Sequence, residues 1–275
     1  MRKQIETWLI FLFLSIFTLG TIYPVLNIFG VSLREDNAFQ TRSLAVISEN
    51  SGLYNYVQLF TGTDFLIWLK NSLLVSAAVT ILGVALASTC AYALSRYRFK
   101  GRNLGMMALL TTQMFPATML LLPFFILLSK LGLINSYLGL VIIYSSTALP
   151  FCIWQMKGFY DTIPPALEES ACLDGCNPLQ AFYKIILPLS TPALVITALF
   201  SFMASWSEYV VAAIILQDPE LYTLPLGLKS FQSSLATEWG LYAAGAVVVS
   251  IPVVILFISL ARFLVSGLTL GSVKG

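Results

Sequence analysis

The chain of 275 residues contains no histidine, and only 10% of its residues are charged. Without histidine it has no imidazole metal ligand, no Ser-His or Cys-His nucleophile pair, and none of the commonest general base. The charged fraction is far below the roughly 25% of soluble domains. Because 58% of the residues are apolar, most of the surface is expected to face something other than water.

Cysteine is also scarce, with four residues and no CxxC pair. Cys172 and Cys176 are four apart and could share a helix face, but two thiols without further ligands make a poor metal site, so we interpret them as small packing residues. The net charge of +2 is too small to indicate nucleic-acid binding. No metal, no bound cofactor and no nucleic-acid partner are therefore expected for this chain.

Long uncharged runs are the main feature of the sequence. A helix rises about 1.5 Å per residue, so about 20 residues cross a bilayer core of about 30 Å. Six uncharged stretches reach that length: Trp8–Leu33, Asn71–Ser95, Asn103–Ser129, Leu131–Met156, Ile185–Ser207 and Trp239–Ala261. The sequence thus predicts an all-α, polytopic membrane protein with six transmembrane helices in contact with membrane lipid.

Lys and Arg set the orientation of such a chain. With the N-terminus in the cytoplasm, ten of the fifteen basic residues lie inside, including the cluster Arg96–Arg102. Both termini are therefore predicted to be cytoplasmic. Residues 34–69 and 217–238 become outer loops, and residues 157–184 form the long inner connection.

Several prolines interrupt the apolar stretches: Pro24, Pro116, Pro123, Pro150 and Pro252. A proline removes a backbone hydrogen bond and kinks a helix. Because Pro116 and Pro123 share one stretch, that helix is expected to bend. Packing irregularity or a hinge along a pathway would each account for these positions.

The inner connection predicts a short helix-turn-helix against the membrane. The prolines at 164–165 suit a first helical turn, and the two glutamates that follow lie near the positive end of the helix dipole. Gly175 can end this helix in a left-handed conformation, and an Asn-Pro turn precedes a second helix, Leu179–Ile186. Composition alone also fits an ordinary amphipathic loop.

The same segment resembles the cytoplasmic signature of ABC importer permeases, which reads EAA, three residues, Gly, nine residues, Ile, one residue, Leu-Pro. The matching residues are Glu169, Ser170, Ala171, Gly175, Ile185, Leu187 and Pro188. Both spacings are kept, and the one departure puts a serine, still small, where the family has alanine. Further likeness covers nearly the whole chain and is weakest over residues 34–69. It is closest to the smaller permease subunit of maltose/maltodextrin-type sugar importers.

This resemblance implies a type I ABC importer permease fold in a bacterial-type plasma (inner) membrane. With a second, different permease subunit, the chain would form the pathway for a di- or oligosaccharide delivered by an extracytoplasmic sugar-binding protein. Two separate ATP-hydrolysing subunits would hold ATP and Mg, so this chain is not expected to be an enzyme. A permease for another solute class, such as glycerol-phosphate or a polyol, is the alternative.

In that family the signature helix docks into a groove of the ATPase, and the resemblance places this coupling segment at residues 164–181. The implied coupling residues are Ala166, Leu167, Glu169, Ser170, Ala171, Leu173, Asp174, Gly175, Ile185, Leu187 and Pro188. Glu169 would pair with a basic group, Ala171 and Gly175 would permit close approach, and Leu167 and Leu173 would fill the groove. The tail would also reach the ATPase: Gly271, Ser272, Val273, Lys274 and Gly275. A frayed terminus is the alternative for the tail.

Glu208 directly follows the fifth uncharged stretch, and we interpret it as an ionisable residue within that span, where charge is costly unless it faces a cavity or a partner. With Trp206 and Tyr209 it could line a sugar pathway, because aromatic faces stack on pyranose rings and carboxylates accept hydrogen bonds from hydroxyls. The alternative is a buried carboxylate satisfied by serine or backbone groups at a subunit interface. Gln113 is a second pathway candidate.

Three segments are expected: residues 1–69 with the first transmembrane helix and an outer loop, residues 70–264 as the transmembrane core with its coupling helices, and residues 265–275 as a cytoplasmic tail. A secondary transporter would need several ionisable groups within its spans and two matching halves. A membrane enzyme would need a cluster of nucleophile, base or metal ligands. The sequence offers neither pattern.

Overall fold

The computed structural model describes residues 2–39, 47, 50–232 and 237–270, and this part of the chain is almost entirely helical. The extended pairings found in it are two isolated β-bridges, Arg34 with Ser51 and Gln232 with Thr237. The chain divides into two compact units. Unit 1 comprises Met1–Leu66 and Gly227–Pro252, and unit 2 comprises Ile67–Leu226 and Val253–Gly275. The predicted all-α class is confirmed.

Unit 1 contains α1 (Arg2–Leu33), α2 (Tyr54–Thr61) and the first part of α13 (Trp239–Leu270). The buried amide of Asn55, on α2, donates hydrogen bonds to the carbonyl oxygens of Ser32 at 3.0 Å and Arg34 at 2.7 Å. A backbone carbonyl at a helix end has no intrahelical donor, so these bonds satisfy the end of α1 and fix α2 against it.

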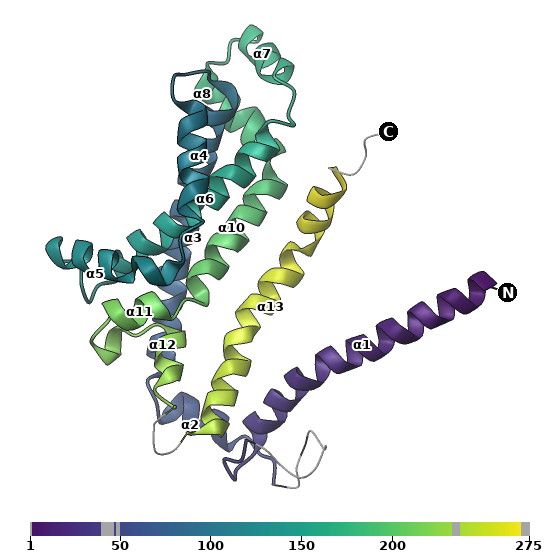
Figure 1. Cartoon of the computed structure of the whole chain (residues 1–275), viewed down its shortest axis with the longest axis vertical. Coiled ribbons are helices and arrows are strands. Elements are labelled where there is room, and N and C mark those ends of the chain that lie inside the picture. Colours follow the sequence, from purple (N-terminus) through teal and green to yellow (C-terminus); the bar gives the residue numbers. More distant parts are fainter. Residues whose placement is uncertain (1, 40–46, 48–49, 233–236, 271–275) are drawn as a thin grey trace. The chain divides into compact units, whose positions relative to one another are not determined.

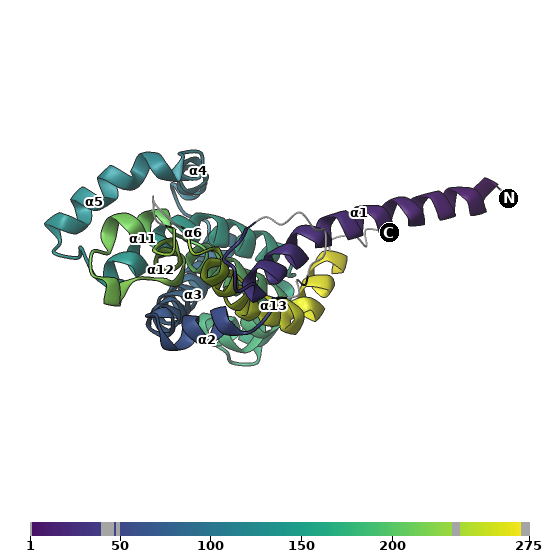
Figure 2. The same cartoon turned by 90° about the horizontal axis from the view of Figure 1, so that it is seen from below.

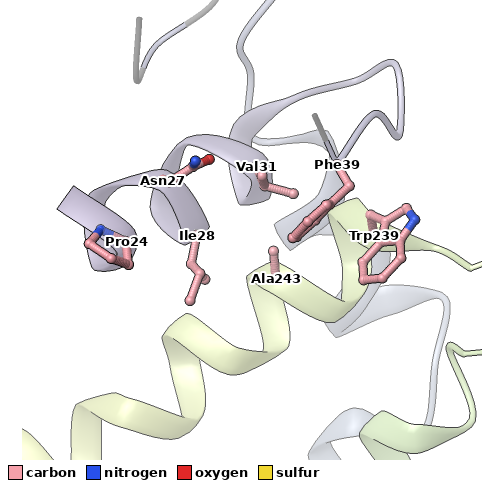
Figure 3. Close-up of a pocket in the computed structure, with 7 residues that line it drawn as sticks. All are labelled: Pro24, Asn27, Ile28, Val31, Phe39, Trp239 and Ala243. Atoms are coloured by element: carbon pink, nitrogen blue, oxygen red, sulfur yellow. The ribbon is translucent and has the colours of Figure 1, made fainter. Parts of the chain in front are cut away.

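An apolar pocket of about 260 Å³ lies in unit 1 where the end of α1 meets the start of α13 (Figure 3). The rings of Phe39 and Trp239 face each other there, with their centroids 4.6 Å apart. Ile28 and Ala243 also line the pocket. Such aromatic pairs add to the free energy gained from burial, so this contact holds the start of α13 next to the segment that follows α1.

Unit 2 carries most of the remaining helices. In chain order they are α3 (Phe65–Arg96), α4 (Arg102–Thr112), the 3₁₀ helix η1 (Ala117–Leu120), α5 (Leu121–Lys130), α6 (Tyr137–Tyr160), α7 (Ala166–Leu173), α8 (Pro178–Ala181), the π-helix η2 (Phe182–Ile186), α9 (Leu187–Leu189), α10 (Thr191–Trp206), α11 (Val210–Ile215), the 3₁₀ helix η3 (Pro219–Leu221) and α12 (Leu224–Lys229), which continues into unit 1. Figure 1 shows α6 and α10 lying along each other, with α7 and α8 at one end of this bundle.

Small residues let α3 and α10 approach closely within unit 2. Ala87 and Ala91 of α3 and Ala193 of α10 are buried in one apolar cluster with Cys152 of α6. At Gly83, an added Cβ would come within 2.6 Å of the hydroxyl of Ser201. Membrane helices gain packing energy where small residues permit such contact, and this explains the glycine in the middle of α3.

Among the described residues, four helices are long and apolar enough to cross a membrane: Gln4–Leu33, Phe65–Arg96, Tyr137–Tyr160 and Trp239–Ala261. A fifth span is obtained if Pro178–Leu189 and Thr191–Trp206, which are bent by 79° relative to each other, are counted together. These correspond to five of the six predicted stretches. The fourth predicted stretch starts later than expected, because residues 131–136 form a turn before α6 begins at Tyr137.

The third predicted stretch is broken rather than continuous. Helix α4 ends at Thr112, and the chain resumes as η1 and α5 after Pro116. Figures 1 and 2 both show α5 directed away from the line of α4. The bend expected from two prolines is confirmed, and it occurs at Pro116 because proline has no N–H to donate to the carbonyl of Thr112. Pro123 lies in the first turn of α5, where no intrahelical donor is needed.

The other membrane prolines do not interrupt their helices. Pro24 lies inside α1, Pro150 inside α6 and Pro252 inside α13. A missing hydrogen bond is tolerated in a membrane helix when neighbouring groups satisfy the freed carbonyl. These three positions are therefore local irregularities of continuous helices, and the expected interruption occurs only in the third stretch.

Candidate functional site

The coupling segment, residues 164–181, folds as two short helices. Pro165 precedes α7, and Glu168 and Glu169 occupy its first turn, where the helix dipole favours acidic groups. Gly175 ends it with a φ of +90°, and the N–H of Cys176 donates to the carbonyl of Ala171 at 2.9 Å. This is a Schellman ending, which requires the left-handed conformation that glycine adopts without strain. The predicted first helix and its glycine end are confirmed.

The second helix begins with a capping box. Asn177 Oδ1 accepts from the N–H of Gln180, and Gln180 Oε1 accepts from the N–H of Asn177, both at 2.9 Å. The helix continues as the π-helix η2 and then α9, and the chain bends at Ser190 into α10. The predicted helix over Leu179–Ile186 is present, but its π-helical part was not predicted. π-helical turns are rare and are often found at functional sites.

Helix α7 has two unlike faces. Ala171 is 7% exposed and therefore packs against the chain itself. On the outward side Glu169, Ser170 and Asp174 are exposed, and Leu173 is 89% exposed. The residue that the resemblance offers for close approach of a partner, Ala171, thus faces inward, and Leu173 provides the apolar surface that a partner could cover.

The inward face of α7 is fastened to the end of α3. The Glu168 carboxylate accepts hydrogen bonds from the hydroxyl of Tyr92, at 2.6 Å, and from Nε of Arg96. Arg96 Nη2 also donates to the carbonyl oxygen of Ile163 at 3.0 Å. The side chains of Arg96 and Glu168 are each 13% exposed. We call the set of Glu168, Tyr92, Arg96 and Ile163 the Glu168 joint.

A second link joins the same end of α3 to the end of α6. Ser95 donates to Asp161 Oδ1 at 2.7 Å, and Lys157 forms an ion pair with Asp161. Partial burial raises the pKa of Asp161. The hydrogen bonds from Lys157 and Ser95 and the charges of Lys157 and Arg102 lower it by more than burial raises it, so the pKa lies below its ordinary value. Charge-assisted bonds of this kind are the stronger hydrogen bonds in proteins.

Aromatic packing stiffens this junction. The ring of Tyr92 lies 4.6 Å from that of Phe182 in the π-helix and 6.2 Å from that of Tyr160, measured between centroids. Phe182 and Tyr160 are buried, with Met156 and Ile186, in the apolar cluster between α3, α6 and α10. A force applied to α7 would therefore reach α3 through the Glu168 joint and the bundle core through the π-helix.

The remaining predicted coupling residues are distributed around these helices. Ala166 and Leu167 are exposed, Ile185 and Leu187 are half-buried, and Pro188 is exposed. Ile185 and Leu187 lie in the π-helix and α9, beyond residue 181, so they belong to the helices that connect the coupling segment to α10 and not to the segment itself. The predicted tail residues, Gly271–Gly275, lie outside the described part of the chain.

Three of the pathway candidates lie at the break between α10 and α11. Trp206 is 2% exposed and stacks on Phe202, with ring centroids 5.2 Å apart. The Glu208 carboxylate accepts from the hydroxyl of Tyr144 at 2.8 Å and from the N–H groups of Val211 and Ala212 at 3.0 and 3.3 Å. Of the two interpretations left open, these bonds favour the carboxylate satisfied within the protein, because its acceptor positions are used by the chain's own donors.

Tyr209 and Gln113 differ in their surroundings. Tyr209 is half-buried and packs against the apolar cluster formed by α3, α5, α6 and α11. Gln113 lies at the end of α4, is exposed, and donates from Nε2 to the carbonyl oxygen of Thr147 at 3.0 Å. It borders a cavity of about 360 Å³, so it is the predicted pathway residue that the structure places at open space.

The segment after α11 is held firmly by asparagine side chains. Asn135 donates to Asp218 Oδ2 at 2.6 Å, and its Oδ1 accepts from the N–H of Gln217 at 2.9 Å. Asn71 donates to the carbonyl oxygens of Glu220 at 2.8 Å and Tyr222 at 3.0 Å. These bonds give residues 217–222, part of the predicted outer loop, a fixed shape on the surface of unit 2.

Residues 80–269 match the family described as the binding-protein-dependent transport system inner membrane component. The chain belongs to this family. The maltodextrin transport system permease protein MdxG of Bacillus subtilis is 36% identical to it over 268 residues, covering 96% of this chain and 95% of that protein. The galactooligosaccharides transport system permease protein GanQ of the same organism is 36% identical over 279 residues, covering 100% and 98%.

A solved structure has a similar fold. The chain superposes with a TM-score of 0.84 and 25% identity, over 95% of this chain and 97% of the other, on a crystal structure of a bacterial ABC transporter involved in the import of the acidic polysaccharide alginate. The predicted importer-permease fold is thereby confirmed. As a member of an inner membrane family of transport components, the chain is a transport protein of the inner membrane.

In this inner membrane component, the Glu168 joint is what sequence reasoning missed. Glu168 was interpreted only as a favourable charge near a helix start, and Arg96 only as part of a basic cluster that sets orientation. Glu168 follows Arg96 by 72 residues, and no local pattern reports a pairing at that distance. The available signal was the scarcity of charge: in a chain with 13 acidic residues, an acidic pair at the start of a short helix is unusual.

Proposed function

We propose that this chain is a permease subunit of an ATP-driven sugar importer, and that α7 is the element through which a separate ATP-hydrolysing subunit moves it. The observation that carries the proposal is the difference between the two faces of α7. Its inward face is tied to α3 by the Glu168 joint, and its outward face presents Leu173, 89% exposed, beside exposed Glu169. An apolar side chain surrounded by polar groups suits the centre of a protein contact.

The substrate and partners are inferred from relatives. The named relatives are permeases of maltodextrin and galactooligosaccharide transport systems. A further crystal structure, with 17% identity and a TM-score of 0.66, is of an alginate ABC transporter in complex with an alginate pentasaccharide-bound periplasmic protein. We infer that this chain and a second permease form a pathway for a di- or oligosaccharide that an extracytoplasmic binding protein delivers. Residues 217–222 are a suitable docking surface for that protein because their shape is fixed.

Orientation follows from the basic residues. Arg96, Arg98, Lys100 and Arg102 cluster at the α7 end of α3, and such clusters stay in the cytoplasm. Helix α7 and both termini are therefore assigned to the cytoplasmic side, where ATP is available. ATP and Mg belong to the partner ATPase in this proposal, and the tail residues Gly271–Gly275 are assigned to contact with it.

The mechanism is a rigid-body switch. Closure of two ATPase subunits around ATP would displace the two permeases' coupling helices, and the pathway would alternate between inward and outward access. In this chain the displacement would pass from α7 through the Glu168 joint to α3, and through the π-helix to α10. The predicted boundaries of residues 1–69, 70–264 and 265–275 remain part of the proposal, with the middle segment as the moving core.

The proposal is tested by Leu173→Asp in the complex reconstituted with its partner permease, ATPase and binding protein. A charge in the apolar centre of the contact should lower sugar uptake by about tenfold or more, since about 1.4 kcal/mol corresponds to tenfold. Leu131→Asp is the matched control, because Leu131 is 59% exposed and lies before α6, whereas α7 follows the end of α6. Wild-type uptake and full ATPase content with Leu173→Asp would contradict the proposal.

A panel of solutes separates sugar from the alternative. Uptake of oligosaccharides but not of glycerol-phosphate or a polyol by the reconstituted complex would support the sugar assignment. Uptake of glycerol-phosphate or a polyol alone would replace the substrate and leave the role of α7 unchanged.

A further inference from the structure

The cavity beside Gln113 lies at the break in the third apolar stretch. It is lined by Thr112, Gln113 and Phe115 from the end of α4 and by Ser146 and Thr147 from α6. Ser146 and Thr147 are near the middle of the 24-residue helix α6, roughly 15 Å from its first residue at 1.5 Å per residue. The cavity is therefore at mid-membrane depth.

Polar groups and non-helical backbone at this depth need an explanation. Irregular backbone in the hydrocarbon region is tolerated only where it is buried in protein or lines a water-filled cavity. Here the chain is non-helical from Gln113 to Pro116, and the side chains of Gln113, Ser146 and Thr147 are exposed at this break. Exposed polar groups next to a helix break in mid-membrane are typical of a site that a solute occupies.

The lining suits one kind of solute. Two aromatic side chains line the cavity: Phe115, which is 57% exposed, and Phe124 of α5, which is half-buried. Gln113 uses Nε2 for Thr147, and its Oε1 can accept from a hydroxyl. Ser146 Oγ donates within its own helix, to Ile143, so it can accept a further hydrogen bond. A stacking surface beside acceptors is what a pyranose ring requires.

Charge distinguishes between sugars. Among the lining residues that the structure describes, none is charged. A uronate buried here would lose hydration of its carboxylate without a cation to replace it, which is costly at this depth. The volume of about 360 Å³ lies within the range of roughly 300–1,000 Å³ typical of small-molecule sites.

We propose that the cavity bordered by Gln113, Phe115 and Ser146 is a binding site of this chain for a residue of a neutral oligosaccharide in transit. The inference rests on the proposed function and deepens it. It assigns this permease a substrate contact of its own, with Phe115 stacking on the sugar and Gln113 and Ser146 accepting from its hydroxyls. It also assigns the chain a preference for neutral over acidic sugars.

The test uses Ser146→Cys in a chain whose four cysteines are replaced by alanine or serine, assembled in the complete transporter with nucleotide and binding protein. A charged thiol reagent should label Cys at this position, and maltotetraose should slow labelling by about tenfold when present at ten times its dissociation constant, since the free fraction is then about one in eleven. An alginate tetrasaccharide should not slow it. Ser129→Cys, exposed in α5 but outside the cavity lining, is the matched control and should be labelled at one rate throughout.

A second variant keeps the test decisive if the cysteine-free chain does not assemble. Gln113→Leu in the otherwise native chain should reduce neutral-sugar uptake by about fivefold, the effect of one lost hydrogen bond between neutral groups, with unchanged ATPase content. Absence of labelling, labelling that maltotetraose does not slow, or protection by the acidic sugar would each overturn the inference. In any of these cases, normal sugar uptake by the wild-type complex would show that the proposed function stands without this inference. Absence of any sugar uptake by the wild-type complex would remove the proposed function itself.

Discussion

Replacing Glu168 with glutamine should separate ATP hydrolysis from sugar uptake. The carboxylate accepts from Tyr92 at 2.6 Å and from Arg96, and both charged side chains are 13% exposed. Hydrogen bonds to charged groups contribute about 1.5–3 kcal/mol, and breaking a fully buried ion pair costs about 3–5 kcal/mol. Because glutamine keeps the volume and one acceptor oxygen, we expect a loss of about 2 kcal/mol. This is about 30-fold in the ratio of molecules whose Glu168 joint is formed (closed) to those in which it is broken (open).

The assay is the number of sugar molecules taken up per ATP hydrolysed by the reconstituted transporter. With the joint open, the ATPase can still move α7 but α3 no longer follows, so hydrolysis should persist while uptake per ATP falls. The double variant Arg96→Glu with Glu168→Arg should recover part of the ratio. Asp64→Asn, which changes an exposed carboxylate, serves as the control. An unchanged ratio in Glu168→Gln would refute the idea that this joint transmits the movement.

Two further predictions concern packing and pH. Gly83→Ala should destabilise the chain by about 1–3 kcal/mol through overpacking, because the new Cβ meets the hydroxyl of Ser201 at 2.6 Å. In thermal unfolding measured in detergent, adding Ser201→Ala should recover part of this loss. A Gly83→Ala variant as stable as wild type would contradict the close approach of the two helices. Since the pKa of Asp161 is lowered in the folded chain, its stabilising effect is present above its ordinary pKa and is lost as pH falls through the lower folded value. Between about pH 5 and 3, the unfolding temperature should therefore fall less in Asp161→Asn than in wild type, and equal slopes would rule out this contribution.

Local chemistry made much of the coupling segment predictable. Gly175 and the Asn-Pro turn act through their own backbone, so the end of α7 and the start of α8 could be predicted from neighbouring residues. Long apolar runs likewise located α1, α3 and α13. These features depend on interactions within a few residues, which a sequence displays directly.

What the sequence did not predict depends on contacts between distant elements. The π-helix at Phe182–Ile186 extends a helix whose composition is unremarkable, and Trp206 resembled a pathway residue until its burial placed it in the core. Glu208 was ambiguous for the same reason, because its partner Tyr144 is 64 residues away. Composition identifies which groups are costly to bury, and only the fold identifies what satisfies them.

The most direct test of the account is the position of the tip of α7 in the assembled transporter. A photoreactive group attached at Leu173→Cys, in a chain with no other cysteine, should form an adduct with the ATP-hydrolysing subunit, identified by mass spectrometry, and one attached at Leu131→Cys should not. Adducts from position 173 that contain only lipid or the binding protein, in a complex that retains its ATPase, would contradict the claim that α7 is the element that the ATP-hydrolysing subunit moves.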